Sequence, residues 1–444
     1  MKKISDTNLC LLLLALLFLV AFSQTAKAQL GQTSSPYSRF GLGLLGNEAQ
    51  GFNTAMSGLG VSLRGGNIAN FTNPASYSAI DSLSFIVDAG MNVSFGNMKQ
   101  GKVAINMRSA QFDYVTMGFR LRRKLGVSVG FMPYTRIGYS FEKRDVVVND
   151  LEHNVDVVSY SSYGGEGGLH QVYAGVGWNP FDKFSVGVNV GFIWGTYSHT
   201  MLQTFDENGQ SSSAFNPLMT QHEASLSSYN ITLGAQYPIR LSQQNVLNVG
   251  ATATMGHSIS GNAVLTRNAG TSYTPTYTAN SPFDLPWRVG VGVSLLHGTQ
   301  WLVGVDAHYD RWSACHTPIW NNSDETFTAS LGEYKDRTKV VAGAQFTPDA
   351  FSKNYLKRVQ YRAGIHYSTP YLVINGEDGP REYGASVGVA LPITNNYNNR
   401  SLLNVGFQWM QRSSNVAGLV KENYFMMNIG LTFNEMWFMK YKIK

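Results

Sequence analysis

The chain has 444 residues, of which 43% are hydrophobic, 12% aromatic and only 14% charged, with a formal net charge of +6. An average soluble domain carries about 25% charged residues, so a large part of this protein's surface is not of the kind that water covers. The 45 glycines follow no Gly-X-Y period and there are only 14 prolines, which excludes a collagen-like or disordered chain. The mild positive charge does not indicate nucleic-acid binding.

The first 28 residues have the pattern of a secretory signal peptide. A basic start is followed by the apolar residues 9–22 and by a small-x-small cleavage pattern at 26–28. We therefore expect residues 1–28 to be removed and the mature chain to begin at Gln29. It then keeps one cysteine, Cys315, which excludes an intramolecular disulfide.

Residues 29–83 show no regular alternation of polarity and contain many turn-forming glycines and prolines. The segment is long enough to fold back into whatever the rest of the chain builds. We predict that residues 29–83 form a plug, or hatch, inside the lumen of a barrel.

From residue 84 onwards, polarity alternates with a period of two. Between residues 184 and 194, for example, Phe184, Val186 and Val188 alternate with Ser185 and Gly187. This period predicts β-strands with one apolar face. The pattern recurs in about fourteen segments: 84–98, 110–124, 125–141, 168–178, 183–201, 224–240, 245–264, 283–297, 300–313, 334–348, 358–372, 381–393, 401–412 and 420–434.

The connections between these segments alternate in length. Those at 179–182, 241–244 and 298–299 are short, whereas those at 142–167 and 202–223 are long. Short turns at one end and long loops at the other are typical of an outer-membrane barrel. The predicted fold class is therefore all-β. Residues 84–434 form a transmembrane antiparallel β-barrel in the outer membrane of a Gram-negative bacterium, both termini are periplasmic, and residues 435–444 form a C-terminal extension.

Tryptophan gives an independent indication, since aromatic residues collect where hydrocarbon meets lipid headgroups. In the predicted topology, seven tryptophans fall near strand ends. The periplasmic set is Trp178, Trp301 and Trp437, and the outer set is Trp194, Trp287, Trp312 and Trp409.

The face opposite the apolar one carries many glycines, which leave room for a plug. It also carries six charged or histidine side chains: Asp88, Arg120, Asp306, His308, Arg362 and His366. Two interpretations are open. These groups fasten the plug through ion pairs and hydrogen bonds, or Arg120 or Arg362 binds the polar head of a ligand, such as a carboxylate.

Patterns that suggest an enzyme lack the context that their chemistry requires. Gly-x-Ser-x-Gly at 126–130 lies within an alternating strand, not at a strand-to-helix turn. Gly-x-Gly-x-x-Gly at 41–46 follows no predicted strand. Asp306 and His308 share a face, but no third metal ligand is identifiable. We predict no enzymatic activity, no cofactor and no metal site.

A glycine-rich segment ending in Asn73-Pro74-Ala75, followed by about fourteen alternating strands, resembles the outer-membrane long-chain fatty-acid transporter family (FadL-like) over the whole mature chain. The resemblance implies that residues 29–83 are a hatch, that the protein binds hydrophobic molecules, and that these leave sideways at a kink in the third strand. Pro133 is a candidate for this kink, because proline cannot donate a ladder hydrogen bond. A proline at the rim of the barrel is the alternative. The tail that contains Trp437 departs from the family and is a candidate contact for a periplasmic partner or lipid headgroups.

Two functions are open. In the first, the barrel binds a hydrophobic small molecule or lipid by burial of apolar surface and passes it across or into the outer membrane, with Arg120 or Arg362 orienting a polar head. The apolar cavity is expected among Phe52, Met56, Phe71, Ile86 and Met132. In the second, the barrel is a non-transporting subunit or scaffold of an outer-membrane protein assembly or secretion complex. The long loops and the tail would then contact outer-membrane or periplasmic proteins, and the hatch would be a permanent filling.

Overall fold

The computed structural model describes residues 35–436, except 151–154, 182, 208–209, 212–214, 271–273, 322, 394–399 and 417. The predicted signal peptide at 1–28 and residues 437–444 of the predicted C-terminal extension lie outside the described residues and stay predictions; residues 435 and 436 of that extension continue β25. Within the described part of the chain, no helix has both the length and the apolar character needed to span a membrane.

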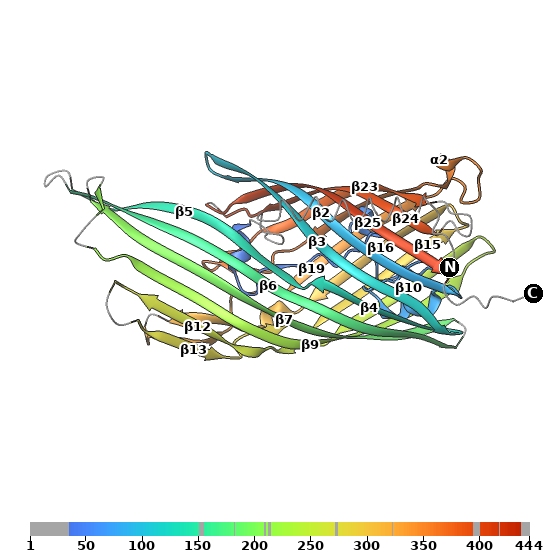
Figure 1. The fold of residues 1–444 in the computed structure, drawn as a ribbon, viewed down its shortest axis with the longest axis horizontal. Helices are drawn as coiled ribbons and strands as arrows, with labels where there is room; N and C mark the ends of the chain where they lie inside the picture. The colour runs from blue at the N-terminus through green and yellow to red at the C-terminus, as the bar shows by residue number, and fades with distance from the viewer. Residues whose placement is uncertain are drawn as a thin grey trace, which may run out of the picture.

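Fourteen antiparallel strands close a barrel (Figure 1), in which β4 and β5 are two parts of one strand. The strands of the wall are β2 (Ser84–Gln100), β3 (Val103–Arg122), β4 (Leu125–Pro133), β5 (Thr135–Asp150), β6 (Val155–Phe181), β7 (Phe184–Glu207), β9 (Leu218–Arg240), β10 (Asn245–Thr254), β15 (Arg288–His297), β16 (Trp301–Asp310), β19 (Arg337–Phe346), β20 (Gln360–Ser368), β23 (Arg381–Ile393), β24 (Ser401–Ser413) and β25 (Lys421–Met436). The last strand pairs with the first, from Ser84↔Met436 to Lys99↔Lys421. The predicted fold class is confirmed, and each predicted segment overlaps a strand of the wall.

The outside of the barrel is apolar. Along β15, Val289, Val291 and Val293 are exposed, whereas the alternate residues Gly290 and Gly292 are buried. A continuous exterior of exposed valine, leucine and phenylalanine is stable against hydrocarbon and not against water. The barrel is therefore a transmembrane one.

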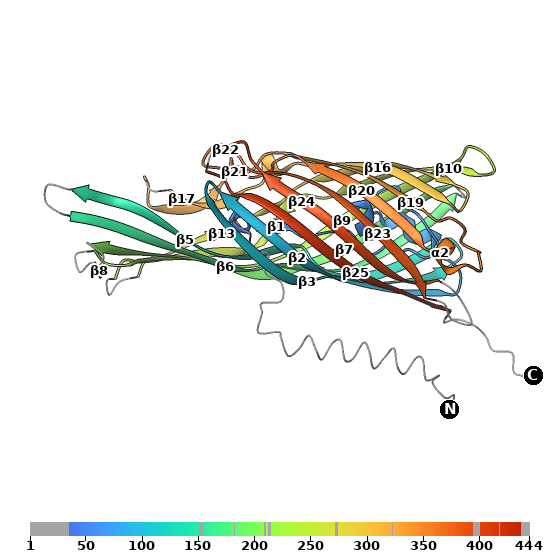
Figure 2. The same ribbon diagram turned by 90° about the horizontal axis from the view of Figure 1, so that it is seen from above.

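The two ends of the barrel differ. At the end where β2 begins and β25 ends, here called the near end, strands are joined by tight turns such as that between Arg122 and Leu125. At the opposite or far end, β5, β6, β7 and β9 continue well past the rim (Figures 1 and 2). The pairing of β5 with β6 runs to Asp150↔Val155, and that of β7 with β9 to Gln203↔Leu218. The predicted loops at 142–167 and 202–223 are therefore wrong, because most of these residues extend strands.

The projecting part of the sheet has an apolar core of its own. Ile193, Leu226, Ile259, Phe283 and Phe327 are buried together on one side of it. Short elements complete this end: β8 (Gln210–Ser211), β11 (His257–Ser258), β12 (Ser260–Asn268), β13 (Thr276–Asn280), β14 (Asp284–Leu285), η4 (Trp312–Ala314), β17 (Thr317–Asn321), β18 (Thr326–Ser330), β21 (Val373–Ile374) and β22 (Glu377–Asp378). A single helical turn, α2 (Tyr355–Arg358), lies at the near end.

Residues 35–83, here called the N-terminal segment, lie within the barrel (Figure 2). They form three 3₁₀ turns and one short strand: η1 (Pro36–Arg39), β1 (Leu44–Leu45), η2 (Thr54–Met56) and η3 (Pro74–Ala79). The segment packs against inward-facing glycines. A Cβ at Gly187 would lie 2.4 Å from the carbonyl carbon of Pro74, and one at Gly364 would lie 2.4 Å from that of Met56. Only glycine at these positions permits such close approach of two backbones.

Candidate functional site

Buried polar side chains of the wall bind the backbone of the N-terminal segment. The Asp306 carboxylate accepts hydrogen bonds from the amides of Gly60 at 2.6 Å and Val61 at 2.8 Å. The Arg362 guanidinium donates to the Gly51 carbonyl at 3.3 Å and to Asn404 at 2.8 Å. These contacts correspond to the first interpretation of the inward charges, in which they fasten the segment to the wall. Hydrogen bonds that involve a charged group are about twice as strong as neutral ones.

Two further donors of Arg362 are also directed at protein acceptors. They reach the side-chain oxygens of Gln345 at 2.8 Å and Gln360 at 2.5 Å. A ligand headgroup would have to displace these partners to bind Arg362. Arg120 lies apart, towards the near end, where its Nε donates to the Arg122 carbonyl at 3.2 Å.

The Asn73-Pro74-Ala75 motif begins η3 and seats it on the wall. The Asn73 side chain caps the turn by accepting from the Ala75 amide at 3.1 Å, and it donates to the Val61 carbonyl at 2.7 Å. Pro74 occupies the first position of the turn, where no amide donor is required. Cβ atoms at Gly187 and Gly234 would overlap Pro74, so the motif fits a shallow depression that glycines leave in β7 and β9.

The five apolar residues expected to line a ligand cavity fall into two separate clusters. Phe71, Ile86 and Met132 pack together in one cluster, and Phe52 and Met56 pack in another. All five side chains are at most 7% exposed. The five residues therefore do not lie together, and both clusters are part of the packed hydrophobic core.

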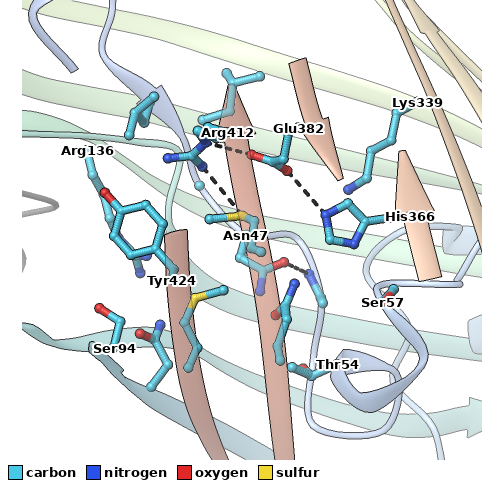
Figure 3. Close-up of a pocket in the computed structure, with 18 of the residues that line it drawn as sticks. Asn47, Thr54, Ser57, Ser94, Arg136, Lys339, His366, Glu382, Arg412 and Tyr424 are labelled. Atoms are coloured by element: carbon cyan, nitrogen blue, oxygen red, sulfur yellow. Dashed lines mark hydrogen bonds and ion pairs between the residues drawn. The ribbon is translucent and has the colours of Figure 1, made fainter. Parts of the chain in front are cut away.

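Two polar cavities lie outside these apolar clusters. One, of about 160 Å³, is lined by residues of the N-terminal segment, such as Asn47, and by inward-facing residues of β2, β3, β5, β19, β20, β23, β24 and β25 (Figure 3). Its charged or histidine lining residues are Arg136, Arg337, Lys339, His366, Glu382 and Arg412. The other, of about 190 Å³, lies among the far-end loops and is lined in part by His199, His222 and Tyr334. Ligand pockets for hydrophobic molecules are usually about 300–1,000 Å³ and mostly apolar.

Charged and histidine side chains from the adjacent strands β20, β23 and β24 contact one another along one wall of the 160 Å³ cavity. Glu382 lies between Arg412, at 2.8 Å, and His366, at 3.5 Å (Figure 3). Lys339 also faces the cavity but forms no ion pair with a residue that the structure describes. This arrangement suits water and small ions. The predicted site did not include Lys339, Glu382 or Arg412, although their positions in alternating strands mark them as inward-facing.

The wall of the barrel is interrupted where β4 ends at Pro133. β3 and β4 pair only as far as Val115↔Phe131, so the part of β3 from Val103 to Tyr114 has β2 as its one described neighbour. Beyond the break, β5 continues the pairing with β6. Pro133 therefore ends β4 at a break between β4 and β5; that the wall opens there for a ligand stays a prediction.

Two groups reach across or into this interruption, here called the gap. β1 of the N-terminal segment pairs with the start of β5 through Leu44↔Arg136 and Leu45↔Thr135. The Arg136 side chain extends from β5 to β3, where it donates to the Gln111 side chain at 2.6 Å and to the Phe112 carbonyl at 2.5 Å. Arg136 is not among the site residues predicted from the sequence.

Cys315 lies in a far-end loop and is 2% exposed, packed with Trp312, Tyr334 and Leu372. Trp312 is buried here, so its assignment to the outer girdle is wrong; it anchors the loop instead. Burial, and then the nearby carboxylates Asp284 and Asp336, raise the pKa of the Cys315 thiol to about 12.

We predict that native Cys315 reacts with iodoacetamide at pH 7.5 roughly 10²–10³ times more slowly than the unfolded chain, because the thiolate is the nucleophile. Mass spectrometry of samples taken over time, with and without denaturant, measures this ratio. Equal rates in the two states would contradict the burial of this thiol.

Among the described residues, no group of three or more His, Cys, Asp or Glu side chains is placed to hold a metal ion.

Comparison with solved structures places the barrel in a known fold. A FadL homologue from Pseudomonas aeruginosa superposes with a TM-score of 0.56 at 12% identity, over 89% of this chain and 98% of that one. The toluene transporter TodX of P. putida gives a TM-score of 0.55 at 14% identity, over 88% and 99%. The toluene transporter TbuX of Ralstonia pickettii gives 0.54 at 14% identity, over 88% and 98%. The FadL-like fold inferred from the sequence is therefore confirmed. No curated protein sequence matches the chain, and the sequence model of one family, described as BamG, matches residues 11–444.

Proposed function

The chain belongs to the BamG family, and we propose that it is a non-transporting barrel subunit, or scaffold, of an outer-membrane protein assembly. In this proposal, the N-terminal segment is a permanent plug and the projecting far end is a contact surface for other proteins. The barrel holds that surface at a fixed position in the outer membrane, with both chain termini in the periplasm.

The observation that carries the proposal is how the N-terminal segment is held. Buried hydrogen bonds join its backbone to the wall, as at Asp306. At Gly187 and Gly364 it packs so closely on the wall that no space is left even for a Cβ atom. Releasing it would leave a buried carboxylate and several backbone groups without partners, at about 1–3 kcal/mol for each unsatisfied group. A gate that must open in every transport cycle is better served by weaker and fewer contacts.

The far end offers a surface of the kind that proteins bind. Val146, Leu202, Phe215 and Met219 are 40–56% exposed on the projecting strands and their loop, beyond the ends of β23 to β25. Contiguous apolar patches exposed to water mark interaction sites, and Leu202 and Met219 are direct cross-strand neighbours in β7 and β9. A transporter has no evident need for a sheet that continues so far outside the membrane.

The test is gentle detergent extraction of the tagged full-length protein from its native outer membrane, followed by mass spectrometry of the proteins and small molecules that remain bound. We expect one or a few proteins in stoichiometric amounts and no enriched hydrophobic molecule. A monomeric barrel that retains a fatty acid or hydrocarbon would overturn the proposal.

A second candidate function is passage of hydrophobic small molecules with lateral exit through the gap. It is supported by the break at Pro133 and by the fold shared with the toluene transporters. The same extraction separates this function from the proposed one. If the protein transports hydrophobic molecules, cells with and without the gene should also differ several-fold in their uptake of labelled toluene or a long-chain fatty acid.

A further inference from the structure

The part of β3 that borders the gap is an open strand edge. Its partner β2 occupies one side, with a regular register from Met91↔Phe112 to Gln100↔Val103. Across the gap, the Phe112 carbonyl accepts a hydrogen bond from Arg136, so the backbone polar groups of Phe112 face the gap. In an antiparallel pair, residues two apart direct their amide and carbonyl groups to the same side. Four further residues therefore present both groups to the gap: Ala110, Arg108, Asn106 and Ala104.

This edge lacks the features that natural sheets use to prevent strand addition. Between residues 103 and 112 there is no proline, the pairing with β2 contains no bulge, and Arg108 is the one charged residue. Proteins usually protect an edge with charges, prolines, bulges or a covering element. Among the described residues, no strand other than β2 pairs with β3 between Val103 and Phe112, and Arg136 reaches β3 only at Gln111, Phe112 and Asp113.

On the other side of the gap, the start of β5 already pairs with a short added strand, β1. β1 pairs with β5 at Thr135 and Arg136, and the next residue of the segment, Gly46, donates its amide to the Tyr134 carbonyl at 2.8 Å. This added strand is two residues long and pairs with β5. On the β3 side of the gap, five residues direct their backbone groups into the gap, and no strand of the described residues pairs with them there.

We propose that an extended segment of a partner protein adds to the β3 edge between Ala104 and Phe112 and closes the gap as an extra strand. The proposal rests on the proposed function and specifies how one partner is held. Main-chain hydrogen bonds to the five edge residues give the affinity, as in other cases of strand addition. Cross-strand neighbours set the side-chain pattern. Apolar residues of the partner lie on the outer face beside Ala110 and Phe112, and polar residues lie on the inner face beside Ser109 and Gln111.

The first test compares two substitutions at one position in the native complex. Ala110→Pro removes an amide that faces the gap and leaves the β2 pairing in place, since proline is tolerated on the open side of an edge strand. Ala110→Val is the matched control, because it adds bulk at the same site but keeps the amide. We expect the proline variant to retain at least tenfold less of the partner that copurifies with the wild-type protein, and the valine variant to retain a wild-type amount.

The outcomes separate the two proposals. If the wild-type protein copurifies with no protein at all, the proposed function fails. If it has a partner that Ala110→Pro retains in full while the barrel is folded, the strand addition is wrong and the proposed function stands.

A second test does not depend on how well the proline variant folds. A photo-crosslinking amino acid is placed in turn at positions 104, 106 and 108 of the protein in its native membrane, and the crosslinked peptides are sequenced. We expect crosslinks to one partner segment whose site moves by two residues with each step along β3. Crosslinks to lipid only, to a second copy of this chain, or to sites without such a progression would overturn the inference.

Discussion

Gly187→Val is expected to dislodge the N-terminal segment from the wall. At this position, a Cβ would lie 2.4 Å from the carbonyl carbon of Pro74 and 2.6 Å from the amide nitrogen of Ala75. These are backbone atoms and cannot move aside as a flexible side chain can. Overpacking of this kind usually costs about 1–3 kcal/mol, and here the strain falls on the motif that seats η3. We expect a lower unfolding temperature in detergent and rapid proteolysis of the N-terminal segment.

Planar-bilayer recordings then show whether the segment closes the lumen. The wild-type barrel is expected to be closed, whereas Gly187→Val is expected to show stepwise openings. Gly164→Val on β6 is the matched control, because a Cβ there meets nothing within 4 Å; it should melt and conduct like the wild-type protein. A Gly187→Val barrel that is closed and equally stable would show that the contact with Pro74 is not what holds η3.

The strands within the membrane could be predicted because one face of each meets hydrocarbon. Along β15, this requirement places valine at alternate positions, with glycines between them. The projecting strands carry no such signal. Ser159 and Ser161 continue β6 and are buried there, but serine at buried positions gives no alternation of polarity, so the sequence there resembles a loop.

The residues of the candidate site were harder to place, for two physical reasons. The N-terminal segment has no periodicity, and its partners are distant in sequence; Gly51 and Arg362 are 311 positions apart. Nothing in the local pattern could therefore show that Phe52 and Phe71 belong to different clusters. Arg136 follows the break at Pro133, and a break resets the alternation from which an inward or outward face is counted.

Arg136→Ala is expected to destabilise the barrel more than any other single change at the gap. The Arg136–Asp113 pair is 3.2 Å apart, with side chains only 11% and 6% exposed. Removing the arginine takes the counter-ion from the buried Asp113 carboxylate, to which Asn92 still donates, and removes the donor to the Phe112 carbonyl. Breaking a buried ion pair costs about 3–5 kcal/mol.

The double variant Arg136→Met, Asp113→Leu tests this explanation. It removes both charges and replaces them with apolar groups, which is often neutral or stabilising for a buried pair. We therefore expect most of the lost stability to return, and a double-mutant cycle to show a large coupling between the two positions. The measurement is the unfolding temperature in detergent, read from heat-modifiable mobility on gels, of the wild-type protein, Arg136→Ala, the single variants Arg136→Met and Asp113→Leu, and the double variant. If Arg136→Ala melts like the wild-type barrel, Arg136 does not hold β3 to β5.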